Sequence, residues 1–202
     1  MTYIPPCIWI DIETTGLNPE LDQILEIGAI ATGEDFKELD RFQTVIRPDK
    51  LDIMSLPSVV YDMHKNNGLL DELRGGLDRE EAQRSFLDWI DRAWKLHPPP
   101  DDQWEPMKPT GNKLRNDAKL LASGSTIEFD VSFMRPFVGG RFWDGIFNYR
   151  LLNVSSVKEI VRRSHGEGML YDSGTAKAHR AISDVEDSLA ELHHYLELMG
   201  AA

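Results

Sequence analysis

The sequence has little of several things that mark particular classes of protein. A single cysteine among 202 residues, Cys7, excludes an intramolecular disulfide and a cysteine-based zinc site. No apolar run approaches the roughly 20 residues that span a bilayer, and the first residues lack a basic segment followed by a cleavable apolar core. Basic residues are also scarce, since 22 Lys and Arg stand against 34 Asp and Glu, for a formal charge of −12. These absences predict a cytoplasmic protein without a membrane role, and they argue against one that grips long nucleic acid by neutralising many phosphates.

What is present has the composition of an ordinary globular protein. Hydrophobic residues make up 41% and charged residues 28% of the chain, so extensive disorder is not expected. At this length a single domain with one large core is the default, and we expect it to cover residues 1–202. Residues 97–118 are predicted to be a loop or insertion, because they hold five of the 11 prolines and show no periodicity.

The order of the predicted elements favours an α/β or α+β domain built on a mixed sheet. Alternating or β-branched apolar residues predict three strands whose succession indicates an antiparallel meander, at 7–13, 24–32 and 36–46. A further short strand is expected at 119–123. Helical periodicity follows the meander, first in a broken stretch, and predicts helices at 55–73, 79–95, 129–138, 156–163 and 178–199.

Local signals mark the ends of some of these helices. Asp78 with Glu81, and Ser156 with Glu159, resemble capping boxes that open the helices next to them. Pro136 is expected to limit the helix that contains it. The Gly-rich, polar segment before the last helix predicts a loop.

An acidic pair on the first predicted strand is the first candidate for chemistry. Asp11 and Glu13 stand two residues apart, so they share one face of the strand. Two adjacent carboxylates repel and resist ionisation, a conflict that a divalent cation removes. Paired oxygen ligands of this kind suit Mg²⁺ or Mn²⁺. Taken alone, an acidic pair that simply ends an exposed strand is the commoner case.

Three residues far along the chain extend this hypothesis. Asp184 stands beside the apolar stripe of the last predicted helix, where a carboxylate needs a partner. His179 precedes it by about one and a half helical turns, near the start of that helix. Asp130 lies at a predicted junction of strand and helix. Each also has an ordinary interpretation, as a salt-bridged aspartate, a surface histidine and a helix N-cap.

Together these residues resemble the DEDDh class of 3′→5′ exonucleases. DIE at 11–13, FDVSFM at 129–134 and H-x-x-x-x-D at 179–184 occur in the order that is typical of that class. Within the class, the chain is most similar to the oligoribonuclease family, and the segments that carry this resemblance are WIDIETTGLNPELDQILEIGAIAT, HKNNGL, NYRLLNVSSVKEI and AHRAISDVEDSLAELHHYL. The resemblance covers most of the chain apart from residues 97–118 and 164–177.

This resemblance implies an α/β, ribonuclease-H-like fold, with a mixed sheet whose first three strands are antiparallel and which is flanked by helices. It also implies a homodimer that degrades very short single-stranded RNA from a free 3′ end with two divalent cations, Mg²⁺ or Mn²⁺. The metal ligands would be Asp11, Glu13, Asp130 and Asp184, and His179 would take the proton from the attacking water. The substrate contacts would be Leu17 as a wedge against a base and, around the terminal 5′ phosphate, His64, Ser125, Thr126, Tyr149 and Arg150.

The implied substrate contacts have alternatives. Leu17 is equally well interpreted as a core residue, Arg150 as half of a surface ion pair, and Tyr149 as a core or dimer-interface aromatic. The chain also departs from the family pattern: Thr126 stands where a serine is usual and Asn153 where an aspartate is usual. Both departures lie outside the five acid and histidine positions.

Two other functions remain open. A DEDDh DNA exonuclease of the proofreading or trimming type needs the same five residues. A non-catalytic nucleic-acid-binding module would have kept the fold without the chemistry, although none of the five positions is missing here.

Overall fold

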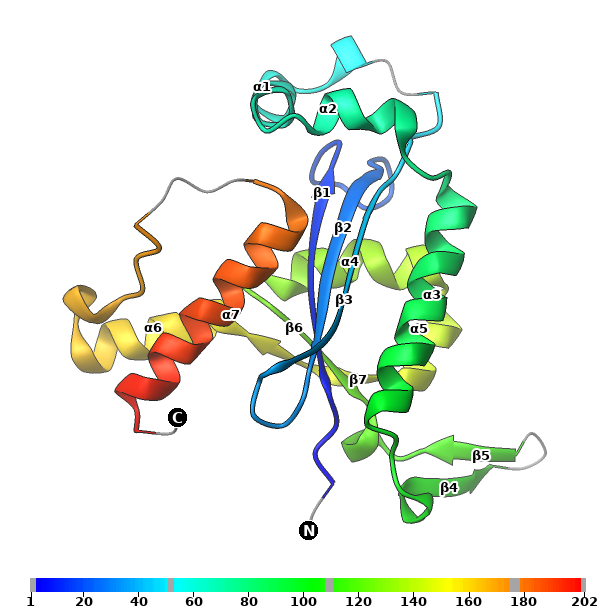
Figure 1. The fold of residues 1–202 in the computed structure, drawn as a ribbon, viewed down its shortest axis with the longest axis vertical. Coiled ribbons are helices and arrows are strands. Elements are labelled where there is room, and N and C mark those ends of the chain that lie inside the picture. Colours follow the sequence, from blue (N-terminus) through cyan, green and yellow to red (C-terminus); the bar gives the residue numbers. More distant parts are fainter. Residues whose placement is uncertain (1–2, 51–52, 108–110, 175–178, 201–202) are drawn as a thin grey trace.

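A five-stranded mixed sheet forms the centre of the molecule in the computed structural model, which describes residues 3–50, 53–107, 111–174 and 179–200 (Figure 1). The strands are β1 (Cys7–Thr14), β2 (Ile24–Thr32), β3 (Glu38–Val45), β6 (Leu120–Gly124) and β7 (Phe147–Asn153), in the spatial order β3-β2-β1-β6-β7. β2 is antiparallel to both β1 and β3, whereas β6 is parallel to β1 and β7. The predicted mixed sheet with three antiparallel first strands is therefore confirmed.

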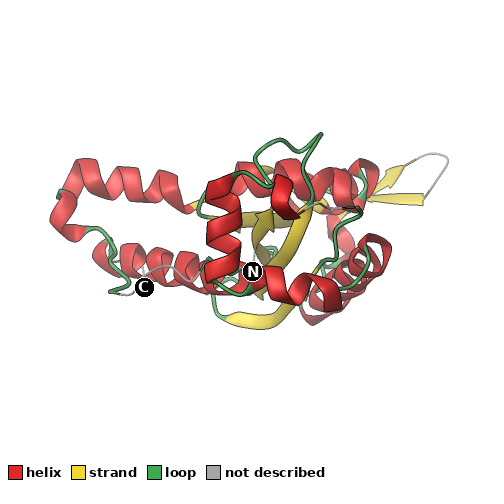
Figure 2. Ribbon diagram, turned by 90° about the horizontal axis from the view of Figure 1, so that it is seen from above, coloured by secondary structure: helices red, strands yellow, loops and turns green. Residues whose placement is uncertain are grey.

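Helices lie on both sides of the strands (Figure 2). They are α1 (Ser58–Asn66), α2 (Leu69–Glu72), α3 (Arg79–Leu96), α4 (Ile127–Val138), α5 (Gly140–Ile146), α6 (Val154–His165) and α7 (Ala181–Leu198). In the described part of the chain, no helix is both long and apolar enough to cross a membrane. The α/β class predicted from the sequence is the observed one.

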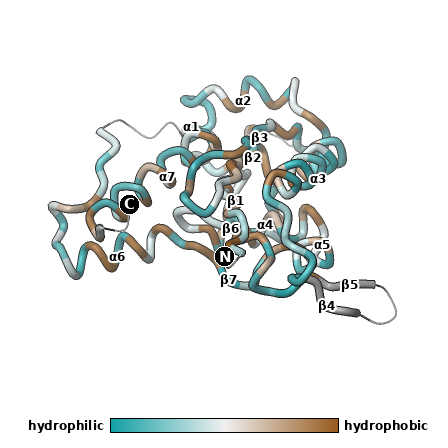
Figure 3. Tube along the Cα trace, turned by 60° about the horizontal axis from the view of Figure 1, so that its bottom comes forward, coloured by the Kyte–Doolittle hydropathy of each residue, from teal (hydrophilic) through white to brown (hydrophobic). Residues whose placement is uncertain are grey.

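The alternation of side chains along β1 divides the core into two clusters. Ile8 and Ile10 pack with residues of α3, α4 and α5 on one face of the sheet. Trp9 points to the opposite face and packs with residues of α6 and α7; hydrophobic and hydrophilic residues alternate along α6, as expected for a helix with one buried side (Figure 3). Asp11 and Glu13 continue the series of Trp9, so the fold directs their carboxylates to the face that α7 covers.

The helix predicted at 79–95 is α3, and its predicted start is confirmed. The Asp78 carboxylate accepts a hydrogen bond from the Glu81 amide at 2.8 Å, and the Glu81 carboxylate accepts one from the Asp78 amide at 3.2 Å. This reciprocal pair is a capping box. The predicted apolar stripe is buried: Ala82, Phe86, Ile90 and Ala93.

Residues 97–118 differ from the predicted loop. They contain a two-stranded antiparallel hairpin, formed by β4 (Trp104–Met107) and β5 (Gly111–Leu114). The sequence hides these strands because Pro106 stands inside β4, and a proline normally argues against a strand. Both strands of a hairpin are edge strands, where a missing backbone donor is tolerated.

The predicted start of α4 is wrong, whereas its predicted end at Val138 is confirmed. The helix begins at Ile127, two residues earlier than expected, and Thr126 is its N-cap. Asp130 therefore lies in the first turn and does not cap the helix. Pro136 lies inside the last turn, so it does not stop the helix before Val138.

The predicted capping box at the start of α6 is also wrong. The helix begins at Val154, because the Asn153 side chain caps it by accepting a hydrogen bond from the Ser155 amide at 3.0 Å. Glu159, which the capping box needs, binds two arginines of its own helix instead, Arg162 at 2.8 Å and Arg163 at 2.6 Å.

The close approach of α7 to β2 depends on a glycine. A Cβ atom on Gly28 would lie 2.4 Å from both the Ala181 carbonyl carbon and the Ile182 amide nitrogen. These are backbone atoms in the first turn of α7, so they cannot move aside without moving the helix. Gly28 thereby sets the distance between the sheet and the turn that carries Asp184.

We predict that Gly28→Ala destabilises the protein by about 1–3 kcal/mol, because the added methyl group overpacks the contact with α7. Urea denaturation measures the change. The matched control is Gly145→Ala in α5, where a Cβ meets no atom within 4 Å and alanine favours the helix; it should denature at the wild-type urea concentration or above it. Wild-type stability of Gly28→Ala would contradict this account of the contact.

Candidate active site

Three carboxylates from two distant parts of the chain meet at one end of β1. Asp11 and Glu13 come from β1, and Asp184 comes from the first turn of α7. One ligand oxygen from each lies within 4.8 Å of the other two. The strand's alternation and the contact of α7 with Gly28 together produce this convergence.

The pKa of Glu13 is strongly perturbed. The residue is only 7% exposed to solvent. Burial, followed by repulsion from Asp184 and Glu26, raises its pKa to about 8, and Arg180 opposes this shift. A further positive charge beside Glu13 would therefore favour its ionised form.

Asp130 lies beside this cluster and not inside it. It is 5% exposed, and one of its carboxylate oxygens accepts a hydrogen bond from the Ile12 amide at 3.1 Å. Ile12 stands between Asp11 and Glu13, so Asp130 contacts the same short stretch of β1 backbone. Burial raises the pKa of Asp130 to about 7, against the lowering effect of that hydrogen bond.

His64, predicted near a phosphate, is fully buried behind Glu13. Its Nε2 atom lies 3.0 Å from the Thr14 carbonyl oxygen, and its Nδ1 atom lies 3.8 Å from the nearer Glu13 carboxylate oxygen. Burial lowers the pKa of this histidine. In this structure it supports the end of β1 and exposes no surface to a ligand.

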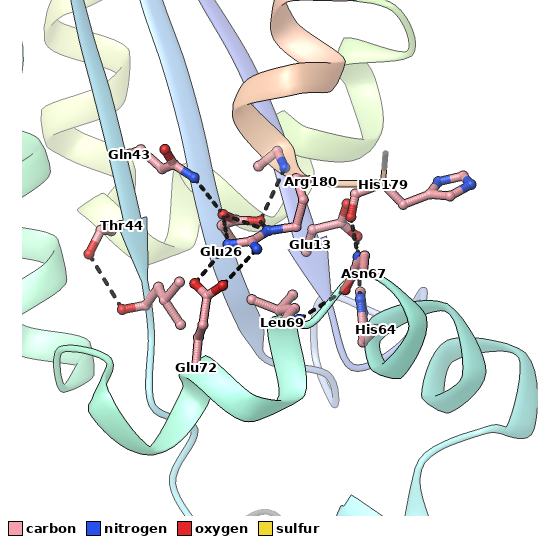
Figure 4. Close-up of polar contacts among 12 residues, drawn as sticks. Glu13, Glu26, Gln43, Thr44, His64, Asn67, Leu69, Glu72, His179 and Arg180 are labelled. Atoms are coloured by element: carbon pink, nitrogen blue, oxygen red, sulfur yellow. Dashed lines mark hydrogen bonds and ion pairs between the residues drawn. The ribbon is translucent and has the colours of Figure 1, made fainter. Parts of the chain in front are cut away.

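His179 lies at the edge of the site with an exposed side chain. It precedes α7, which begins at Ala181. The start predicted from the sequence, near residue 178, lies outside the described residues. The φ of His179, 49°, is in the left-handed region, and its carbonyl oxygen accepts a hydrogen bond from the Asn67 side chain. The imidazole ring points away from Glu13 and His64 (Figure 4).

Ser125 and Thr126 connect β6 to α4 near the carboxylates. Ser125 and Asp184 line the same pocket, and the Ser125 hydroxyl lies 3.4 Å from the Ser155 hydroxyl. Thr126, the N-cap of α4, is exposed. Leu17 is 81% exposed on the turn after β1, so its interpretation as a core residue is wrong.

Tyr149 and Arg150 lie on the edge strand β7, away from the carboxylates. Leu151, the next residue, is level with Ile8 across the parallel strands. With about 3.3 Å per residue and about 4.8 Å between strands, this register places the Cα atom of Arg150 roughly 16 Å from that of Asp11. Tyr149 is 71% exposed, which excludes a core role, and the Arg150 guanidinium lies 4.8 Å from the centre of its ring.

Sequence reasoning misses a buried ion pair next to the site. Glu26 is fully buried in β2 and binds Arg180, which also binds Glu72 in α2. A signal for it exists, since Glu26 is the only charged residue in the apolar strand ILEIGAIAT. No pattern in the sequence indicates its partners.

The chain is similar to several known proteins. The RNase_T family, described as an exonuclease, matches residues 8–104. An oligoribonuclease of Streptomyces griseus is 32% identical over 191 residues, which cover 94% of this chain and 84% of that protein. An oligoribonuclease of Tropheryma whipplei is 33% identical over 193 residues, which cover 94% of this chain and 91% of that protein.

Solved structures share the fold. E. coli exonuclease I in complex with a 5cy-dA13 oligonucleotide has a TM-score of 0.59 at 15% identity, and exonuclease I from Methylocaldum szegediense has a TM-score of 0.61 at 16% identity. Each alignment covers 96% of this chain but only 40% of the other, so this chain spans well under half the length of these exonucleases. The shared architecture confirms the ribonuclease-H-like fold, and the sequence relationship along nearly the whole chain shows that it belongs to the oligoribonuclease family.

Proposed function

We propose that this chain is a 3′→5′ exoribonuclease that hydrolyses the phosphodiester bonds of very short single-stranded RNA with the help of divalent cations. The observation that carries the proposal is the meeting of Asp11, Glu13 and Asp184 within 4.8 Å, in a chain related to oligoribonucleases over 94% of its length. Asp130 beside them completes the acidic set. A non-catalytic module has no need to keep such mutually repelling groups together.

The donor set fits a hard divalent cation. The three clustered acids offer only carboxylate oxygens, which are the ligands that Mg²⁺ and Mn²⁺ prefer. We propose two such ions, held by Asp11, Glu13 and Asp184, with Asp130 as a further ligand of the second. When bound, they would activate a water molecule and stabilise the leaving oxygen.

His179 is the proposed general base, because histidine is the side chain best suited to exchange protons near neutral pH. It directly precedes Arg180 and the first turn of α7, which carries Asp184, and its side chain is exposed. Ser125 and Thr126 are proposed contacts of the terminal 5′ phosphate, and exposed Leu17 is the proposed wedge against a base. A contact between His64 and phosphate would require α1 to move, since this side chain is buried.

A homodimer is part of the proposal. Tyr149 and Arg150 lie on the edge strand β7, away from the carboxylates of their own chain, and we propose that they contact the 5′ phosphate of a substrate bound by a second copy. Arg150 suits such a contact because its planar fork donates two hydrogen bonds to phosphate oxygens. We also propose a cytoplasmic location, which the buried free thiol of Cys7 supports.

The raised pKa of Glu13 predicts a pH-dependent stability in protein freed of metal. The ordinary pKa is 4.5 and the folded value is about 8, so between these values the unfolded chain has lost a proton that the folded chain keeps. The free energy of unfolding should therefore fall as pH rises through this window, by at most about 1.4 kcal/mol per pH unit for one carboxyl group. Urea denaturation between pH 5 and pH 8 measures this slope.

Glu13→Gln supplies the comparison, because it removes the titrating group and keeps the side-chain shape. The slope should be shallower in this variant, and Mn²⁺ should flatten it in the wild type, since a cation stabilises the ionised form. Equal slopes in the two proteins would contradict the assigned proton.

His179→Ala should lower turnover by about 10²- to 10⁴-fold, the usual contribution of a general base, while Mn²⁺ binding by calorimetry stays unchanged. His165→Ala, an exposed histidine at the end of α6, is the matched control and should keep wild-type turnover. Wild-type rates in His179→Ala at saturating Mn²⁺ would refute the base assignment.

The substrate class is tested with 5′-labelled RNA and DNA of two, five and twenty nucleotides. We expect the fastest turnover on the RNA dinucleotide, and none in Asp11→Asn, which controls for a contaminating nuclease. Processive removal of nucleotides from the long DNA would instead support the DNA exonuclease. This alternative is tested because solved structures with the same fold contain DNA oligonucleotides.

A further inference from the structure

Glu26 forms the buried end of an ion-pair network beside the proposed site. It lies opposite Glu13 in the register of β1 and β2. Its carboxylate accepts hydrogen bonds from Arg180 Nε at 3.0 Å, from Arg180 Nη2 at 2.9 Å and from the Ala181 amide at 3.1 Å. The last of these bonds satisfies a free amide at the start of α7. A fully buried carboxylate requires partners of this kind.

Arg180 carries the network to a third element. Its Nη1 and Nη2 atoms donate to the two carboxylate oxygens of Glu72 in α2, at 2.8 and 2.9 Å. One guanidinium group thus joins β2, the start of α7, and α2 (Figure 4). Its planar fork allows this, since it can bind two carboxylates at once.

His179 lies directly before this junction, and its backbone is held from both sides. Asn67, between α1 and α2, donates to its carbonyl oxygen, and Arg180 follows it in the chain. A positive φ costs a residue with a side chain about 1–2 kcal/mol, so it persists only where the surroundings impose it. The backbone of His179 is therefore restrained, whereas its imidazole ring is exposed.

We infer that Arg180, through Glu26 and Glu72, is a positioning residue that fixes the backbone of His179 at the entrance of the site. This inference rests on the proposed function, because it assigns a role relative to the proposed base. None of the three residues needs to touch substrate. The network acts by keeping the backbone of His179 in place, so that a rotation of the side chain is enough to bring the imidazole ring to the attacking water.

The Glu72 arm offers a clean test because it is half exposed. The Glu72 side chain is 50% exposed, and surface ion pairs contribute little to stability. Glu72→Gln should therefore leave the protein folded. The matched control is Glu186→Gln: Glu186 lies in α7, is also 50% exposed, and binds Arg41 of β3 at 2.9 Å, so it too joins the helix to the sheet.

The experiment measures kcat and KM on an RNA dinucleotide at saturating Mn²⁺ for both variants, each in the wild-type and the His179→Ala background. We expect Glu72→Gln to lower kcat on the order of tenfold, because misplacing a reacting group by about an ångström is costly, with little change in KM or in Mn²⁺ affinity. In the His179→Ala background it should lower kcat no further, since no base is left to misplace. Glu186→Gln should leave kcat unchanged in both backgrounds.

Two results would overturn the inference and leave the proposed function standing. One is a kcat for Glu72→Gln equal to that of Glu186→Gln. The other is a loss of kcat in Glu72→Gln that persists undiminished in the His179→Ala background, which indicates a structural effect unrelated to the histidine. A wild-type protein that hydrolyses no short RNA would refute the proposed function itself, and the inference with it.

Discussion

Repulsion among carboxylates is the constraint on which the rest of the site depends. One carboxylate oxygen from each of Asp11, Glu13 and Asp184 lies within 4.8 Å of the other two, and burial, together with repulsion from its acidic neighbours, raises the pKa of Glu13 to about 8. Folding against such an interaction is costly unless an external positive charge relieves it. A divalent cation would supply that charge, so the same feature that opposes folding without metal would favour the binding of metal.

The backbone positions of β1 and of the first turn of α7 hold these acids together. Strand alternation in β1 sends Asp11 and Glu13 to one face, and Gly28 lets the first turn of α7 come close enough to add Asp184. Arg180 then neutralises a further buried acid nearby, Glu26, and ties it to helix α2. The result is a cluster of mutually repelling acids next to a buried acid whose charge an arginine balances.

Much of this could be predicted from the sequence, because it depends on short-range rules. The period of two in β1 placed Asp11 and Glu13 on one face, and the apolar stripe of the last helix placed Asp184 at its edge. The rest depends on long-range packing, which local patterns do not encode. Nothing near Glu26 indicates Arg180 as its partner, and nothing near His64 indicates that it packs behind the strand. Similarly, the hairpin within 97–118 is hidden by proline, and strand order and register separate Tyr149 from Asp11.

The central claim is that these acids hold divalent cations. Anomalous diffraction from crystals grown with Mn²⁺ tests it most directly, because the signal locates the ion itself. The account predicts one peak among the carboxylates of Asp11, Glu13 and Asp184 and a second beside Asp130. Crystals that show those oxygens turned apart with no peak between them would contradict it.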